Sequence, residues 1–219
     1  MNLNHSTFWR VKDGFSSFFR ISYGLFLISA HEEGRDNACI ANTVMQLTDS
    51  PRRISVVLNK SNLTCDMIAK TKRLAVSVLS NDAPFALFRH FGFQSGRDTD
   101  KFDGSFGCQR EANGLLSLNV YTNAVFLANV IDVMDVGTHM LFVVEVEDAR
   151  TLSNLPSLIY ADYFAYVKPK PEASTKPKGY VCKICGYVYE GETLPPDFVC
   201  PLCKHGAEDF EPLQRNVIF

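Results

Sequence analysis

The stretch YVCKICGYVYEGETLPPDFVCPLC, residues 180–203, carries the strongest structural signal in the chain. It contains two Cys-x-x-Cys pairs, and 14 residues separate the first pair from the second. Two residues between cysteines let both thiolates face one ion from a tight turn, and two such turns together build a tetrahedral sulfur cage. The segment therefore predicts a small metal-binding domain whose ligands are Cys182, Cys185, Cys200 and Cys203.

The cysteines alone leave the identity of the metal open, because zinc and iron both accept four sulfur ligands in a tetrahedron. Gly186 follows the first pair and gives the backbone the freedom to turn N–H groups toward the sulfurs. Aromatic residues flank both pairs, and in so small a domain we expect them to form the core. They are Tyr180, Tyr187, Tyr189, Phe198 and Phe210.

The chain has seven cysteines among 219 residues, and the other three, Cys39, Cys65 and Cys108, are scattered. A cluster plus scattered cysteines indicates a metal site with ordinary free thiols rather than a disulfide framework, as expected in a reducing cytoplasm. The first 20 residues lack the apolar run of a signal peptide, and no segment reaches the ~18 apolar residues of a transmembrane helix. We therefore expect no membrane partner, and a net charge of −2 argues against a nucleic-acid partner.

Residues 168–179 mark the boundary between two predicted domains. The segment holds three Pro and four Lys and almost no apolar residue, so we expect an extended, semi-rigid linker. It separates a large domain, 1–167, from a small one, 180–219. The small domain is acidic, since its three basic and six acidic residues give it a charge of −3.

The large domain has the pattern of a mainly β fold. Short alternating or β-branched segments predict strands, and two segments predict helices, the second with Pro84 at its first position. Strands that follow one another through hairpins, with few helices, favour a closed barrel over a parallel sheet. The expected strands are 22–30, 37–47, 53–58, 73–79, 115–121, 125–133 and 140–146, the helices are 63–71 and 84–91, and 92–113 is a long loop.

One part of this pattern, NACIANTVMQLTDSP at residues 37–51, is unusually small and polar for a strand. Small side chains let a flat ring approach the backbone, and Asn42, Thr43 and Gln46 offer hydrogen-bond donors and acceptors. An ordinary edge strand explains the same composition, so these residues alone are a weak indication of a ligand.

This segment and four others resemble the flavin reductase-like family, whose fold is an FMN-binding split β-barrel. The similarity covers most of residues 20–167 and rests on VLNKSNLT (57–64), SGRDTDKF (95–102), GTHMLFVVEV (137–146) and YADY (160–163). His139 keeps the family's histidine, whereas Thr138 and Val144 stand where the family usually has Asp and Gly. The resemblance implies a homodimer that binds FMN.

The resemblance also implies roles for individual residues. The ring of FMN would lie against residues 37–46, its phosphate would lie at the start of the helix 63–71, and a charged loop would contact an anionic nucleotide. His139 would be the catalytic group beside the nicotinamide and the flavin. The implied cofactor-binding residues are Asn37, Ala41, Asn42, Thr43, Gln46, Asn59, Lys60, Ser61, Thr64, Arg97 and Lys101.

Several of these residues also have a plain structural explanation. Ser61 or Asn62 would serve equally well as a helix N-cap. Arg97 and Lys101 fit a solvated charged loop, and His139 fits a hydrogen-bonded side chain at the end of a barrel.

The small domain resembles the rubredoxin family, in the short form found at the end of rubrerythrins. The match covers residues 180–213 and favours one redox iron over zinc in the four-cysteine site. The sequence departs from the family at Lys204, where most rubredoxins have Gly. This departure bears on the N–H···S hydrogen bonds of the second turn, which help to set the reduction potential.

A flavin domain joined to a rubredoxin domain resembles the high-molecular-weight rubredoxins of anaerobes. A hydride carries two electrons whereas a four-thiolate iron takes one, so the resemblance implies an oxidoreductase that passes electrons from NAD(P)H through FMN to the iron. The external protein acceptor would be a flavodiiron-type oxygen or nitric oxide reductase. Two alternatives stay open: the barrel supplies reduced FMN to another enzyme while the small domain is a zinc-binding interaction ribbon, or another donor replaces the nicotinamide.

Overall fold

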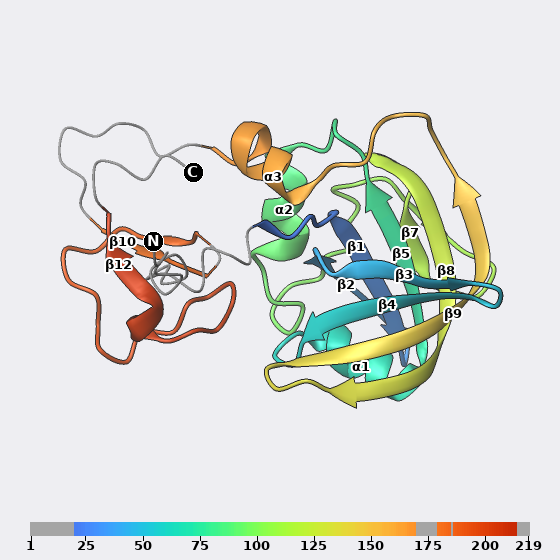
Figure 1. The fold of residues 1–219 in the computed structure, drawn as a ribbon, viewed down its shortest axis with the longest axis horizontal. Helices are drawn as coiled ribbons and strands as arrows, with labels where there is room; N and C mark the ends of the chain where they lie inside the picture. The colour runs from blue at the N-terminus through green and yellow to red at the C-terminus, as the bar shows by residue number, and fades with distance from the viewer. Residues whose placement is uncertain (1–19, 170–178, 185, 214–219) are drawn as a thin grey trace, which may run out of the picture.

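The computed structural model describes residues 20–169, 179–184 and 186–213. Figure 1 shows a β-barrel and, beside it, the small domain that carries the cysteine cluster. The predictions for Cys185 and for residues 170–178 of the linker lie outside the described residues.

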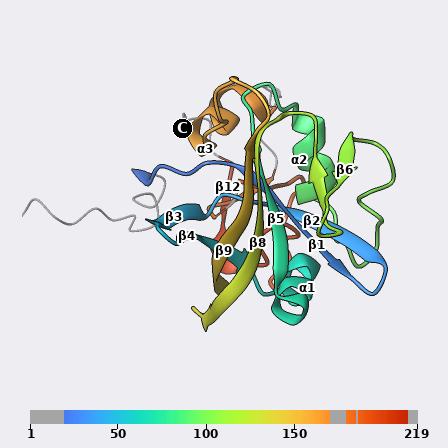
Figure 2. The same cartoon turned by 90° about the vertical axis from the view of Figure 1, so that its right-hand side faces the viewer.

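A seven-stranded antiparallel sheet forms the large domain, in the order β2-β1-β5-β8-β9-β4-β3. Its strands are β1 (Phe26–Glu32), β2 (Arg35–Ala41), β3 (Val44–Asp49), β4 (Arg52–Asn59), β5 (Arg73–Leu79), β8 (Thr122–Asp135) and β9 (His139–Thr151). Two further short strands, β6 (Cys108–Arg110) and β7 (Leu116–Leu118), pair with each other. The expected mainly β fold is confirmed, and Figure 2 shows the long strands β8 and β9 side by side in the barrel wall.

The barrel is open between its two edge strands, β2 and β3. In the part of the chain that the structure describes, no ladder joins these strands, although they follow each other directly in sequence. The closed ring expected from the hairpin pattern is therefore wrong, and the sheet has the form of a split barrel. The single strand expected at 37–47 is also wrong, because the chain turns a corner at Asn42 and Thr43, between β2 and β3.

Two helices cover opposite faces of the first strands. Helix α1 (Leu63–Thr71) fills the barrel interior, where Met67 and Ile68 are buried among side chains of the strands. Helix α2 (Phe85–Gly92) packs on the other face of β1, against Leu25 and Leu27. Both faces of β1 are thus buried, which explains why its first three residues, Phe26, Leu27 and Ile28, are all apolar.

The two predicted helices are confirmed in kind, and the second is displaced by one residue at each end. Helix α1 has the expected limits, whereas α2 begins one residue late because Pro84 is its N-cap rather than its first helical residue. The long loop expected at 92–113 contains the short strand β6. Among the described residues, no helix is both long and apolar enough to cross a membrane.

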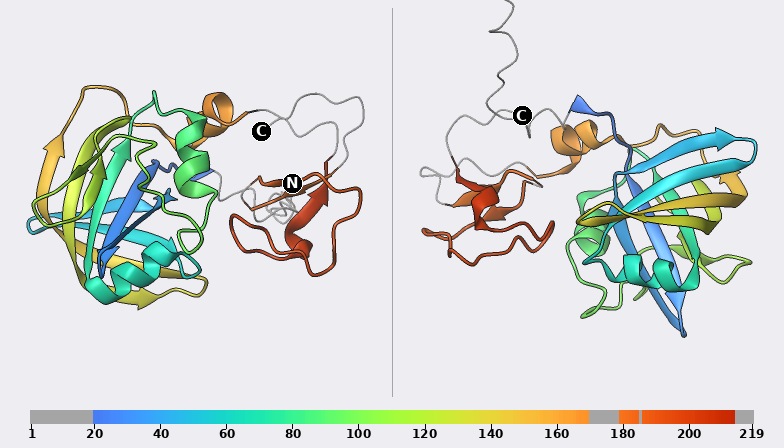
Figure 3. Two further views of the ribbon diagram at one scale, coloured as in Figure 1. Left: turned by 180° about the vertical axis from the view of Figure 1, so that it is seen from behind. Right: turned by 60° about the horizontal axis from the view of Figure 1, so that its bottom comes forward.

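The chain leaves the barrel through a short helical segment and then forms the small domain (Figure 3). The segment consists of α3 (Tyr160–Asp162) and the π-helical turn η2 (Tyr163–Val167). In the small domain, β10 (Tyr180–Cys182) pairs with β11 (Val188–Tyr189) and with β12 (Phe210–Pro212), which follows the short helix η3 (Ala207–Asp209). The aromatic core expected there is confirmed, since the five predicted aromatic residues pack in one cluster with the cysteines.

Candidate metal and flavin sites

Three of the four predicted metal ligands converge in the small domain. The Sγ atoms of Cys182, Cys200 and Cys203 lie within 4.8 Å of one another, and 3.5 Å separates Cys182 from Cys203. Metal–sulfur bonds of about 2.3 Å in a tetrahedron place neighbouring sulfurs about 3.8 Å apart, so the described thiols fit one four-coordinate ion. Cys185 lies outside the described residues, and its place as the fourth ligand stays a prediction.

The two cysteine turns share one backbone geometry but differ in the residue that adopts it. After the first pair, Gly186 has a φ of +72° and its N–H donates to the Cys182 carbonyl at 2.8 Å. After the second pair, Lys204 has a φ of +63° and its N–H donates to the Cys200 carbonyl at 3.0 Å. The second turn therefore forms despite the lysine, although a side chain in this left-handed region costs about 1 kcal/mol.

The proposed phosphate site lies where β4 passes into α1. The N-cap residue Asn62 makes no side-chain capping hydrogen bond, so its side chain accepts none from the first N–H groups of this nine-residue helix. Lys60 and Ser61 are exposed beside the helix start, and the Ser61 N–H donates to Asn59 Oδ1 at 2.8 Å. A helix N-terminus with an adjacent cation and hydroxyl is the usual chemistry of a phosphate site, so these residues fit the phosphate of FMN.

The turn between β8 and β9 completes this corner of the barrel. The Lys60 backbone N–H donates to the Thr138 carbonyl at 3.1 Å, and the Lys60 ammonium lies 2.5 Å from the carboxylate of Asp135. The hydrogen bond from Lys60 holds the pKa of Asp135 below its ordinary value. The sequence analysis missed Asp135, and the only signal for it was the expected hairpin that brings the end of β8 back to His139.

His139 lies at the start of β9, directly opposite Asn59 in the ladder between β9 and β4. Its Nδ1 lies 2.8 Å from the hydroxyl of Thr138. Burial, and then the charge of His205 in the small domain, hold the pKa of His139 below its ordinary value. The imidazole is therefore neutral near pH 7, where it can donate from one nitrogen and accept at the other.

The predicted ring-binding residues gather at the corner between β2 and β3. Asn42 and Thr43 are partly exposed there, and the Thr43 hydroxyl donates to Asn42 Oδ1 at 2.9 Å. The Thr43 carbonyl accepts from the N–H of Val57, three residues before Lys60, so the corner adjoins the phosphate site. Ala41 and Gln46 flank the corner, the first buried and the second exposed.

Three predicted cofactor residues lie instead in the interior. The Asn37 amide donates to the Thr64 hydroxyl at 2.9 Å, and both side chains are buried. The Lys101 ammonium is buried too, and it donates to the carbonyls of Ala38 at 2.9 Å and Phe91 at 2.8 Å. These contacts favour structural roles over contact with a nucleotide.

The structure also describes the loop residue Arg97 and the three scattered cysteines of the barrel. Arg97 is exposed as expected of a charged loop, and it pairs with Asp66 of α1 at 2.6 Å. The scattered thiols have the raised pKa values of ordinary buried cysteines, since burial raises the pKa of Cys65 to about 12 and that of Cys108 to about 11.

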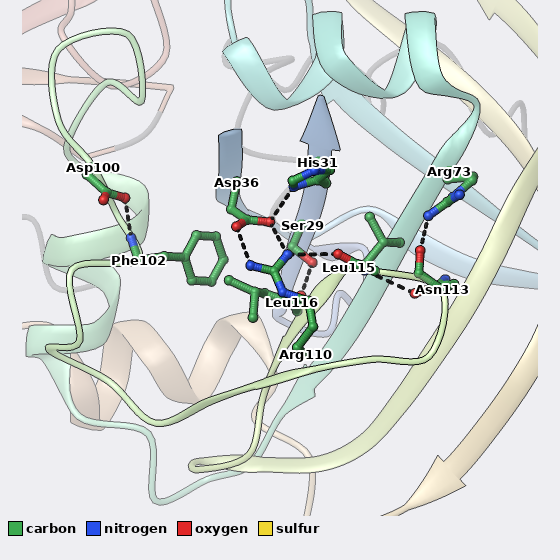
Figure 4. A network of polar contacts seen from close by, with 11 residues as sticks. Ser29, His31, Asp36, Arg73, Asp100, Phe102, Arg110, Asn113, Leu115 and Leu116 are labelled. Atoms are coloured by element: carbon green, nitrogen blue, oxygen red, sulfur yellow. Dashed lines mark hydrogen bonds and ion pairs between the residues drawn. The ribbon is translucent and has the colours of Figure 1, made fainter. Parts of the chain in front are cut away.

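A separate hollow of about 340 Å³ opens at the turn between β1 and β2, and none of the predicted cofactor residues lines it. Figure 4 shows its main polar contact: the Arg110 guanidinium binds both oxygens of Asp36, at 2.7 and 2.6 Å. His31 lies 2.9 Å from the same carboxylate. Burial raises the pKa of Asp36, but the bonds and charges of Arg110 and His31 outweigh it and hold the pKa below its ordinary value. Asp36 and Arg110, two of the charged residues that line this hollow, are thus paired with each other.

Comparisons with known proteins agree with this two-part architecture. Residues 18–166 match the model of the flavin reductase like domain, and residues 180–211 match that of the rubrerythrin rubredoxin-like domain. The high molecular weight rubredoxin of Moorella thermoacetica is 34% identical over 87% of this chain and 96% of its own length. The ferric-chelate reductase (NAD(P)H) of Archaeoglobus fulgidus is 39% identical over 73% of this chain and 94% of its own.

A solved structure shows the same fold in the large domain. The NADH:FAD oxidoreductase SgcE6 of Streptomyces globisporus C-1027 superposes with a TM-score of 0.61 and 18% identity, over 67% of this chain and 85% of that one. The chain is therefore an oxidoreductase of the flavin reductase-like family, and it carries a C-terminal rubredoxin-like domain as high molecular weight rubredoxin does.

Proposed function

We propose that the protein passes electrons from a reduced nicotinamide nucleotide, through FMN, to one iron held by the four cysteines, and then to a separate protein acceptor. The observation that supports this most is the presence of two redox-type sites on one chain: a thiol cage of the right dimensions, and a phosphate-type corner beside a polar turn. FMN, when bound, supplies the exchange between a two-electron hydride and single electrons.

In this proposal, the residues of the barrel bind and orient the flavin. Lys60, Ser61 and the start of α1 hold the phosphate, and the corner at Asn42 and Thr43 faces the ring. His139 stays neutral at the edge of the same corner, where it positions the nicotinamide without repelling its positively charged oxidised form.

The functions of two similar proteins favour a nicotinamide as the donor. One is a ferric-chelate reductase (NAD(P)H), and the solved structure is an NADH:FAD oxidoreductase. The relation to high molecular weight rubredoxin favours iron over zinc in the cage. The flavodiiron type of acceptor stays a prediction that rests on the resemblance of the sequence. The small domain carries a charge of −3, so we expect the acceptor to dock with a basic surface and the rate to fall with salt.

The outer face of the barrel supports the proposal of a homodimer. Large apolar side chains are exposed on strand β3 and at, or just after, the far end of β8. They are Met45, Leu47, Ile131, Met134 and Val136. Strands β4 and β9 lie between the two groups in the sheet. Large apolar side chains exposed on one sheet fit a protein interface, so we expect a second copy of the chain to pack against this sheet.

The cysteines of the barrel support the proposal of a reducing compartment, the cytoplasm. Cys39, Cys65 and Cys108 form no disulfide with any residue that the structure describes. Cys39 and Cys65 are buried and Cys108 is partly buried, and burial raises the pKa of all three thiols, as expected of free cysteines in a reducing compartment.

The proposal is tested by comparing the wild type with Cys182→Ser, with Cys108→Ser as the matched control. Each protein is mixed anaerobically with NADH or NADPH, and then with a purified flavodiiron nitric oxide reductase. We expect all three to lose the flavin absorption, and only Cys182→Ser to stop the consumption of nitric oxide. Equal consumption with Cys182→Ser would show that electrons bypass the iron, and a flavin that neither nucleotide reduces would exclude the nicotinamide donor.

A further inference from the structure

The barrel touches the first cysteine turn through one lysine. Lys168 directly follows η2, and its Nζ donates to the carbonyl of Gly186 at 3.0 Å. The same ammonium lies 4.9 Å from the centre of the Phe164 ring, so one aromatic face and one carbonyl hold it. The Gly186 N–H donates in turn to the carbonyl of the predicted ligand Cys182 at 2.8 Å, so the contact places a positive charge at the first cysteine turn.

The approach of the barrel to this turn is close. A Cβ atom at Gly186 would lie 2.8 Å from Lys168 Nζ and 3.5 Å from the ring of Phe164. The glycine therefore serves two purposes, because its φ of +72° forms the turn and its missing side chain admits the lysine. The contact joins the first residue of the predicted linker to the small domain that follows it.

We propose that Lys168 is a positioning residue for electron transfer, which seats the first cysteine turn on the barrel and favours the reduced state of the metal held there. This inference rests on the proposed function. Addition of one electron turns iron(III) into iron(II), so the four-thiolate cage gains one negative charge. An ammonium beside the cage stabilises that extra charge, and water screens the charge less where the contact is partly buried.

The test measures the reduction potential of the iron in the full-length chain. Wild type, Lys168→Met, Lys168→Arg and Lys70→Met are compared after reconstitution with iron, in an electrochemical cell with small-molecule mediators. Lys168→Met keeps the aliphatic stem and removes the charge, whereas Lys168→Arg keeps the charge and the donors. Lys70 is the matched control, since it is an exposed lysine of α1 that pairs with Glu32.

At a fixed potential, we expect the ratio of reduced to oxidised iron to fall at least about threefold in Lys168→Met. Lys168→Arg should restore the ratio, and Lys70→Met should leave it at the wild-type value. A Lys168→Met protein with the wild-type ratio, or an equal fall in Lys70→Met, would overturn the inference. The mediators supply the electrons, so this result does not depend on NADH, FMN or the acceptor, and failure of the proposed function would show separately in the nucleotide experiment.

A second measurement tests whether Lys168 holds the first cysteine turn against the barrel. Amide hydrogen exchange is followed across residues 163–168 and 180–187 in the same four proteins. We expect faster exchange in both segments of Lys168→Met, because the contact that joins them is lost, and the wild-type rate in Lys168→Arg. Unchanged exchange in Lys168→Met would show that Lys168 does not seat the turn.

Discussion

The sulfur cage and the flavin corner are built in opposite ways. The cage takes its cysteines from a single segment, residues 182–203, and two local turns bring the described ones, Cys182, Cys200 and Cys203, together. The corner takes its residues from the end of β4, the start of α1, the turn between β8 and β9, and the break between β2 and β3. A site made by local turns depends on spacing alone, whereas a site made by four distant segments exists only in the folded barrel.

The largest effect expected from this difference is the loss of one domain without the other. Cys200 is fully buried, so Cys200→Ser should abolish metal binding and unfold the small domain, whose core is too small to persist without the metal. The barrel should keep its flavin and its thermal midpoint. Metal content per chain and hydrogen exchange measure both effects, with Cys108→Ser as the control, and a fully metallated Cys200→Ser protein would contradict the cage.

A second variant separates the scaffold of the corner from its binding residues. Lys101→Met leaves the carbonyls of Ala38 and Phe91 without their donor, which should lower the free energy of unfolding by about 1–3 kcal/mol. FMN affinity per folded molecule should not change. Denaturant unfolding and a flavin titration test this. A loss of FMN affinity without a loss of stability would show that Lys101 is a binding residue.

The same variant has a signature in its pH dependence. Burial holds the pKa of Lys101 below its ordinary 10.5, so between the lowered pKa and 10.5 the unfolded chain binds more protons than the folded one. The contribution of Lys101 to stability should therefore be complete above 10.5 and be lost as the pH falls through the lowered pKa. The difference in unfolding free energy between wild type and Lys101→Met, measured across this window, should grow with pH; a constant difference would show that the pKa is ordinary.

A smaller effect is expected at the phosphate site itself. Lys60→Ala should weaken FMN binding about tenfold, because it removes one charge-assisted contact. Stability should change little, since Lys60 is exposed. Lys70→Ala is the control for loss of one charge, and the flavin titration of both variants is the measurement. Equal affinities for FMN in all three proteins would remove Lys60 from the site.

The smallest effect compares the two cysteine turns. Lys204→Gly should stabilise the small domain by about 1 kcal/mol, because it relieves a side chain held at a φ of +63°. Gly186→Ala should act in the opposite direction, through the same strain and the close approach of Lys168. The thermal midpoint of metal release measures both, and the account of the turns is wrong if Lys204→Gly is the less stable protein.

The sequence predicts the features set by local patterns better than the contacts between residues that are distant in the chain. The spacing of the cysteines, the aromatic core and the limits of α1 come from local patterns, and the structure agrees with them. Lys101 was expected at a nucleotide, but its partner Ala38 lies 63 residues away, and no local pattern shows such a contact. The polar side chains of Asn37 and Thr64 fit a ligand site and a buried hydrogen-bonded pair equally well, and the structure shows the buried pair. Asp135 was missed for the related reason that only the hairpin brings it to Lys60.

The central claim is that flavin and iron in this chain form one electron pathway. The most direct measurement is the metal content and the visible spectrum of the purified protein, before and after addition of NADH without oxygen. The account predicts one iron per chain, a flavin band and a ferric-thiolate band, and it predicts that both bands bleach. A chain that holds zinc, or a ferric-thiolate band that persists after the flavin has bleached, would contradict it.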